Sequence, residues 1–205
     1  MKYSFTTETP MEQTIDASLR RVKIRRELAD ALGCESRSMR QYASCALLGV
    51  AEQNFEDVLE FAPEVFDALN RPEPMTRYQA LRIINIFINH DPRCIDKVFE
   101  DIEACLYDEE SPNVRGSAFK VLAHYGSTTA KRSEKVWPSL SDAIRCWHRD
   151  VVFMDMVNDV ITLLEGKCSP RVLVEAADLF EFDVESNDVA LKKKAKYIVS
   201  LKPAE

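Results

Sequence analysis

Residues 98–126, VFEDIEACLYDEESPNVRGSAFKVLAHYG, predict two amphipathic helices joined by a short acidic turn. The turn, residues 108–112, contains aspartate and ends on a proline, which favours a break between the helices. In the second helix, apolar residues recur with the spacing of a single helix face: Val114, Ala118, Val121, Leu122 and Tyr125. Neither helix can bury such a face alone, so the pair requires neighbouring helices.

The second of these helices recurs in the chain without gaps. Residues 38–50 (SMRQYASCALLGV), 75–87 (MTRYQALRIINIF) and 113–125 (NVRGSAFKVLAHY) share an arginine, an alanine three residues later and an aliphatic residue seven residues later. The arginine column continues through positions 40, 77, 115, 153 and 192, which are 37, 38, 38 and 39 residues apart. A helix pair that recurs at this period indicates an α-solenoid.

The turn followed by Val-Arg-x-x-Ala-x-x-x-Leu resembles the HEAT repeat, a relative of the armadillo repeat. The third copy matches that pattern residue for residue through Asp108, Pro112, Val114, Arg115, Ala118, Leu122 and Gly126. The fourth and fifth copies diverge, with Phe153 and Lys192 in the arginine column. The resemblance implies an all-α fold, a right-handed α-α superhelix of HEAT/armadillo type with about five helix pairs. It also implies a structural role for the column residues Arg40, Arg77 and Arg115.

We expect a loose leader at residues 1–10 and one HEAT-like domain over 11–202. Its repeats would span approximately 11–53, 55–90, 92–126, 130–165 and 169–202. The first helix is expected to run unbroken over residues 11–32, and Pro63 to kink the helix at 56–69 or mark its true start. Ser169 is expected to cap the helix at 170–182, and Ser186 or Asn187 the helix after it.

Composition argues against several functional classes. The formal charge of −7 disfavours a dedicated nucleic-acid binder. The first ten residues lack the apolar core of a signal peptide, and the longest uncharged stretch, residues 41–51, is too short to cross a bilayer. None of the six cysteines forms a CxxC pair, so we expect free, core-filling thiols in a cytoplasmic protein without a membrane partner. No metal site or other cofactor is expected.

No catalytic motif is supported by its context. Residues 148–150, His-Arg-Asp, match the catalytic-loop tripeptide of protein kinases, but no glycine-rich loop accompanies them, and Asp150 is better explained as a helix N-cap. One enzyme class stays open as an alternative, the HEAT-like alkylpurine DNA glycosylases, with Trp137, Trp147 and Asp150 as the residues that could take part. We therefore name no catalytic residue and keep nucleic acid as the less favoured partner.

The second helices of HEAT-like repeats line the concave face, so the resemblance implies that a partner would bind there. Opposite the core positions these helices carry Tyr, Arg, Asn and Lys, residue types suited to a protein or peptide groove. The sequence thus predicts a non-enzymatic protein-binding scaffold or adaptor, while an ordinary solvated face stays open. The predicted partner-binding residues are Tyr78, Arg82, Asn85, Asn89, Lys120, His124 and Asn158.

Overall fold

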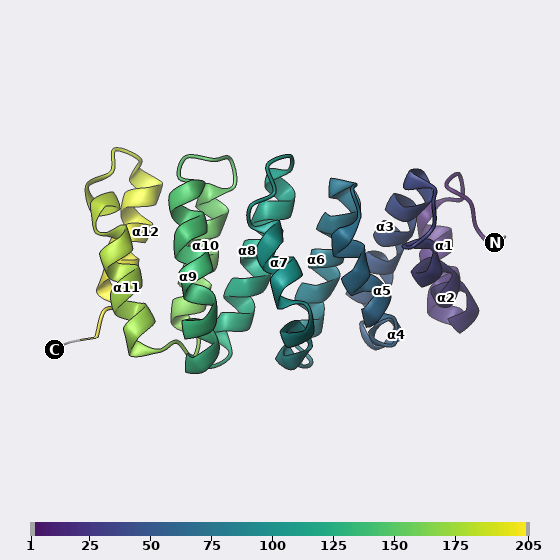
Figure 1. Cartoon of the computed structure of the whole chain (residues 1–205), viewed down its shortest axis with the longest axis horizontal. Helices are drawn as coiled ribbons and strands as arrows, with labels where there is room; N and C mark the ends of the chain where they lie inside the picture. Colours follow the sequence, from purple (N-terminus) through teal and green to yellow (C-terminus); the bar gives the residue numbers. More distant parts are fainter. Residues whose placement is uncertain (1–2, 204–205) are drawn as a thin grey trace. The chain divides into compact units, whose positions relative to one another are not determined.

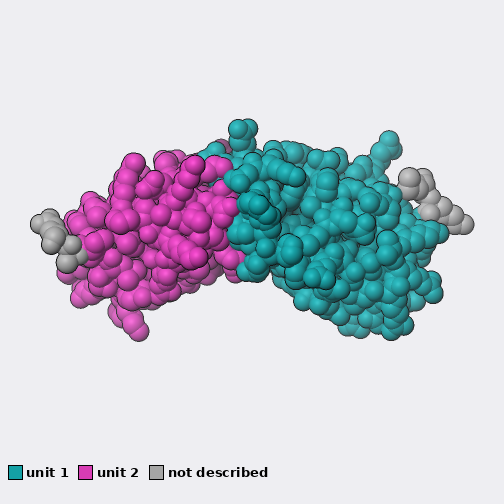
Figure 2. Space-filling model, turned by 90° about the horizontal axis from the view of Figure 1, so that it is seen from below, with its two compact units in different colours: residues 1–105 teal, residues 106–205 magenta. Residues whose placement is uncertain are grey.

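A computed structural model describes residues 3–203, which contain only helices and the loops between them (Figure 1). The chain divides into two compact units, unit 1 over residues 1–105 and unit 2 over residues 106–205 (Figure 2). The single domain expected over residues 11–202 stays a prediction. Within each unit, neighbouring helices cover one another's apolar faces, as the sequence requires.

Unit 1 contains the first two repeats, which end on the long helices α3 and α6, and the first helix of the third repeat. Its elements are α1 (Met11–Arg20), α2 (Val22–Ala31), α3 (Arg37–Gln53), α4 (Glu56–Leu59), α5 (Ala62–Asp67), η1 (Ala68–Asn70), α6 (Pro74–Ile88), η2 (Pro92–Lys97) and α7 (Phe99–Cys105). Here α3 packs along α6. Residues 3–9 are not loose, because Phe5 is buried and stacks on Tyr42, while the Ser4 amide donates to Glu27. Residues 1–2 of the expected leader lie outside the described residues.

Unit 2 is built from longer helices. Its elements are α8 (Pro112–Ser127), α9 (Ala130–Cys146), α10 (Phe153–Glu165), α11 (Pro170–Phe180), η3 (Phe182–Glu185) and α12 (Val189–Ser200). Helix α8 packs along both α9 and α10, and α12 packs on α10 and α11. The helices α8, α10 and α12 therefore form one layer, with α9 and α11 beside them in the other (Figure 1).

The prediction of one unbroken helix over residues 11–32 is wrong. Arg21 has an extended backbone (φ −138°, ψ 106°), which separates α1 from α2. The buried Arg25 guanidinium donates to the Ser18 carbonyl at 2.7 Å, beside the Arg21 amide, and lies 3.0 Å from Asp57, so it holds the chain at the break. Pro63 lies in the first turn of α5 and marks the start of that helix, one of the two roles expected for it.

The alanine column marks the tightest part of the core. Ala43, Ala80, Ala118 and Ala195 are at most 2% exposed, which fits a position where packed helices leave no room for a larger side chain. The aliphatic column four residues later is equally buried at Leu47, Ile84 and Leu122. Positions that are equivalent in the sequence repeat therefore occupy equivalent packing positions in the structure.

Polar side chains set several helix starts. Ser169 accepts a hydrogen bond from the Val172 amide at the start of α11, which confirms the predicted cap. The cap of α12 is Asp188, which accepts from the Ala190 and Leu191 amides, so the predicted caps Ser186 and Asn187 are wrong. A carboxylate at this end also interacts favourably with the helix dipole.

Two glycines in α8 should respond oppositely to alanine. A Cβ at Gly126 would lie 2.6 Å from Val136 Cγ2 and 2.7 Å from Leu163 Cδ1, both buried. We expect Gly126→Ala to lower the free energy of unfolding by about 1–2 kcal/mol through overpacking. Chemical denaturation monitored by tryptophan fluorescence measures this, because Trp137 and Trp147 both lie in unit 2.

The matched control for this substitution is Gly116→Ala in the same helix. A Cβ there would make ordinary contacts with Val152 at 3.4 Å. Alanine should then stabilise by up to about 1 kcal/mol through its higher helix propensity. Equal effects of the two substitutions would contradict the packing described for Gly126.

Candidate functional site

The arginine column holds turns together in unit 1. Arg40 donates to the carbonyls of Cys34 and Glu35 at 2.6 and 2.8 Å, and pairs with the carboxylate of Glu73 in the next repeat. The hydrogen bond from Arg40 lowers the pKa of Glu73, which keeps this buried carboxyl ionised. Arg77 likewise donates to the carbonyls of Arg71 and Pro72. These contacts confirm a structural role for both arginines.

Arg115 makes the corresponding contacts in unit 2, where it is 3% exposed. It donates to the Asp108 carbonyl and to Asp150 Oδ2, each at 2.6 Å, and its guanidinium lies 4.0 Å from the centre of the Trp147 ring. Trp147 in turn donates from Nε1 to the Leu106 carbonyl at 2.8 Å. Arg115 is therefore the centre of a buried polar cluster that joins two turns, as expected.

The residues considered for DNA glycosylase chemistry are engaged in packing. Trp137 is 3% exposed, Trp147 belongs to the Arg115 cluster, and Asp150 pairs with Arg115. The prediction that Asp150 is an N-cap is wrong: Val152 precedes the first residue of α10, and Asp150 accepts the Val152 amide from outside the helix. Trp137 is therefore part of the core, while Trp147 and Asp150 are both held by contacts with Arg115.

Four of the seven predicted partner-binding residues belong to α6 and its C-cap and form what we call the unit 1 face: Tyr78, Arg82 and Asn85 lie on the helix, and Asn89 directly follows it. Arg82 contacts three of its neighbours. Its Nη2 lies 2.6 Å from Oε1 of Glu52 on α3, its Nη1 donates to Gln79, and its guanidinium carbon lies 5.7 Å from the centre of the Tyr78 ring. Arg82 and Asn89 are exposed, whereas Tyr78 and Asn85 are half-buried. This face thus combines a cation, a phenol ring and two amides.

The other three predicted residues lie on α8 and α10 and form the unit 2 face: Lys120, His124 and Asn158. Lys120 and Asn158 are exposed, and Lys194 of α12 donates to the Asn158 side chain. Burial, followed by the charge of Lys120, lowers the pKa of His124. The imidazole is therefore kept neutral at pH 7, when it can both donate and accept a hydrogen bond.

Asp159 belongs to this region and was missed from the sequence. Burial raises the pKa of its carboxyl from 3.8 to about 7, an effect that Lys120 opposes and Asp155 reinforces. Asp159 lies six residues after the arginine column, where the other copies place buried aliphatic residues: Ala46, Ile83, Val121 and Ile198. An acidic residue in that column was the signal that could have identified it.

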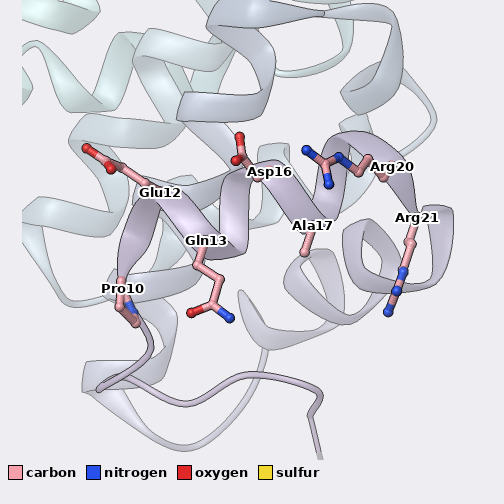
Figure 3. Close-up of a pocket in the computed structure, with 7 residues that line it drawn as sticks. All are labelled: Pro10, Glu12, Gln13, Asp16, Ala17, Arg20 and Arg21. Atoms are coloured by element: carbon pink, nitrogen blue, oxygen red, sulfur yellow. The ribbon is translucent and has the colours of Figure 1, made fainter.

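Other features of the described residues are less suited to a site. A hollow of about 570 Å³ is lined by residues from the single stretch Pro10–Arg21, as Figure 3 shows, so it is a surface feature of α1. No group of three or more His, Cys, Asp or Glu side chains in residues 3–203 is placed to hold a metal. All six cysteines are free, but only Cys105 is buried; the core-filling prediction holds for Cys105, is wrong for the exposed Cys146, and fits the four half-buried cysteines only in part. Within the same range, no helix has the length and hydropathy needed to span a membrane.

Comparisons with known proteins identify the fold. No protein-family model and no curated protein matches the sequence. Among solved structures, a designed armadillo repeat protein in complex with peptide (KR)4 matches with a TM-score of 0.71 and 14% identity, over 96% of each chain. An archaeal HEAT-like repeats protein from Thermococcus onnurineus NA1 matches with a TM-score of 0.61 and 12% identity, over 95% of this chain and 93% of that one. These likenesses and the helices described above confirm the all-α repeat solenoid expected from the sequence.

Proposed function

Because the chain has the fold of armadillo and HEAT repeat solenoids, we propose that it is a non-enzymatic scaffold that binds a peptide or protein segment. The unit 1 face and the unit 2 face would each make contacts, every face within its own unit. The observation that carries the proposal is the concentration of exposed and half-buried polar side chains on second helices whose opposite sides form the core. A solenoid provides such a surface from residues that its own packing does not need.

The chemistry of the two faces suits an extended segment. Asn85, Asn89 and Asn158 carry amides that can donate to a backbone carbonyl and accept from a backbone amide. Tyr78 and Arg82 offer a large contact area of the type enriched at binding hot spots. The designed armadillo neighbour, whose complex contains the peptide (KR)4, supports peptide binding as a use of this fold.

A direct experiment selects peptides from a displayed random library on the purified protein and then measures their affinity by fluorescence anisotropy. We expect the triple variant Tyr78→Ala, Arg82→Ala, Lys120→Ala to bind a selected peptide at least about tenfold more weakly. Arg82 and Lys120 are exposed and Tyr78 is half-buried, so the variant should keep its fold.

The control replaces the same residue types at exposed positions away from the two faces: Tyr107→Ala, Lys131→Ala and Arg145→Ala. This variant should bind as the wild type does. Equal weakening in both triple variants, or a selection that yields no peptide, would count against the proposal.

A further inference from the structure

A cleft of about 760 Å³ lies in unit 2, and none of the partner-binding residues considered above lines it. One wall is the α9–α10 loop with the start of α10, and the other is η3 with the start of α12. Its apolar lining comes from both walls: Phe153 and Met154 on one side, Phe182 and Leu191 on the other. The cleft is therefore formed between two successive repeats.

Three large apolar side chains are left in solvent at this cleft. Phe182 is 87% exposed, Val151 83% and Val189 81%. Phe182 lines the cleft, while the two valines directly follow the lining residues Asp150 and Asp188. Among residues 3–203 the next most exposed large apolar side chain is Val22 at 55%. Such concentration of exposed apolar surface marks interaction sites in folded proteins.

The walls of the cleft are held by specific contacts. His148 Nε2 lies 3.3 Å from Oδ1 of the buried Asp183, which joins the two walls. The His148 ring also packs 4.5 Å from the Phe153 ring. Arg149 next to it has φ 75°, a left-handed conformation that costs energy in a residue with a side chain. The cleft is thus a formed feature of the fold.

The charge of the cleft is negative. Five carboxylates line it, against the single arginine Arg149. Asp150 is paired with Arg115, Asp183 with His148, and Glu185 with Lys192 at 3.1 Å. Glu181 and Asp188 have no ion pair within residues 3–203, although Asp188 accepts two backbone amides at the start of α12. An apolar surface is therefore bordered by uncompensated negative charge.

From this combination we infer that the cleft docks a linear segment of a partner protein in which large apolar side chains lie between lysine or arginine residues. The apolar side chains would cover Phe182 and the cleft lining, and the flanking cations would face Glu181 and Asp188. An acidic segment or a nucleic-acid backbone would meet the same carboxylates with like charge. None of the seven residues of the two faces lines this cleft, although its lining residue Met154 lies one turn before Asn158 on α10.

The test uses a fluorescein-labelled hexapeptide with Leu-Phe between two Lys-Arg pairs. Two control peptides replace Leu-Phe by Ser-Ser, or the four basic residues by Glu. We expect the first peptide to bind with a dissociation constant of tens of micromolar, and each control at least about tenfold more weakly. Binding should also weaken as salt is raised from about 0.05 to about 0.5 M.

Variants of the full chain locate the binding. Phe182→Ser should weaken binding about tenfold and Glu181→Lys several-fold, and both positions are exposed enough to keep the fold. Val22→Ser and Glu109→Lys are matched controls at exposed positions elsewhere and should bind as the wild type does. The triple variant Tyr78→Ala, Arg82→Ala, Lys120→Ala should also bind normally, which separates this inference from the proposed function.

Five results would overturn the inference. The first four are no binding up to about 1 mM peptide, equal binding of the Ser-Ser peptide, tighter binding of the acidic peptide, and equal effects of Phe182→Ser and Val22→Ser. A fifth is self-association of the wild type, seen by sedimentation and abolished by Phe182→Ser. In that case the occupant of the cleft would be a second copy of this chain.

Discussion

Replacing Arg115 by alanine is expected to lower the free energy of unfolding of unit 2 by about 3 kcal/mol. The substitution removes the cation that pairs with Asp150, the donor to the Asp108 carbonyl and the group stacked on Trp147. It leaves a carboxylate whose side chain is only 20% exposed without its partner. Denaturant unfolding followed by tryptophan fluorescence measures the change, since both tryptophans lie in unit 2.

Two comparisons make this prediction specific. Arg145→Ala, on the exposed surface of α9, should change stability by less than about 0.5 kcal/mol. In an Asp150→Asn background, Arg115→Ala should cost at least about 1 kcal/mol less, because no ionised partner is left behind. If Arg115→Ala matched Arg145→Ala, the structural role of the column would be refuted in this repeat.

Asp159→Asn is expected to stabilise the protein by about 2 kcal/mol at pH 8. The pKa of Asp159 is raised from 3.8 to about 7 by burial, so the folded state binds its proton more tightly than the unfolded state does. Between these two values the wild-type protein therefore loses stability as pH rises, and above about 7 the loss levels off. Asparagine cannot ionise and should not show this fall.

The pH dependence distinguishes this effect from a general gain in packing. The difference between Asp159→Asn and wild type should be small below pH 4, grow towards pH 7 and then stay constant. Asp67→Asn, at an exposed position on α5, should differ little from wild type throughout. A difference that is the same at every pH would contradict the raised pKa of Asp159.

The repeat was predictable because the same residue types recur at the same positions in successive copies. The arginine and alanine columns recur in copies whose other residues differ, and the structure shows why: Arg40 and Arg115 join turns, and the alanines fill the tightest packing positions. The second helices were also predictable, since their apolar faces run for several turns without a proline. The alkylpurine glycosylase alternative, in contrast, rested on Trp137, Trp147 and Asp150, whose packing only the structure reveals.

Features set by distant contacts could not be predicted in this way. The break at Arg21 follows an uninterrupted apolar pattern, and it is stabilised by the contacts of Arg25 with Ser18 and with Asp57 of the next repeat. Phe182 was expected to end a helix, but α11 stops at Phe180 and leaves it exposed. Local sequence carries little information on where a helix breaks or ends when contacts with distant residues decide it. The partner-binding residues stay a prediction, because exposure alone does not show what a surface binds.

If the second helices provide the binding surface of a scaffold, a bound peptide should protect them from exchange. Hydrogen–deuterium exchange of the protein, with and without a peptide selected on it, tests this claim most directly, because it reports on every helix at once. We expect the peptide to slow exchange on α6, α8 and α10, around Arg82, Lys120 and Asn158. Protection confined to α9 and α11, with no change in the second helices, would contradict it.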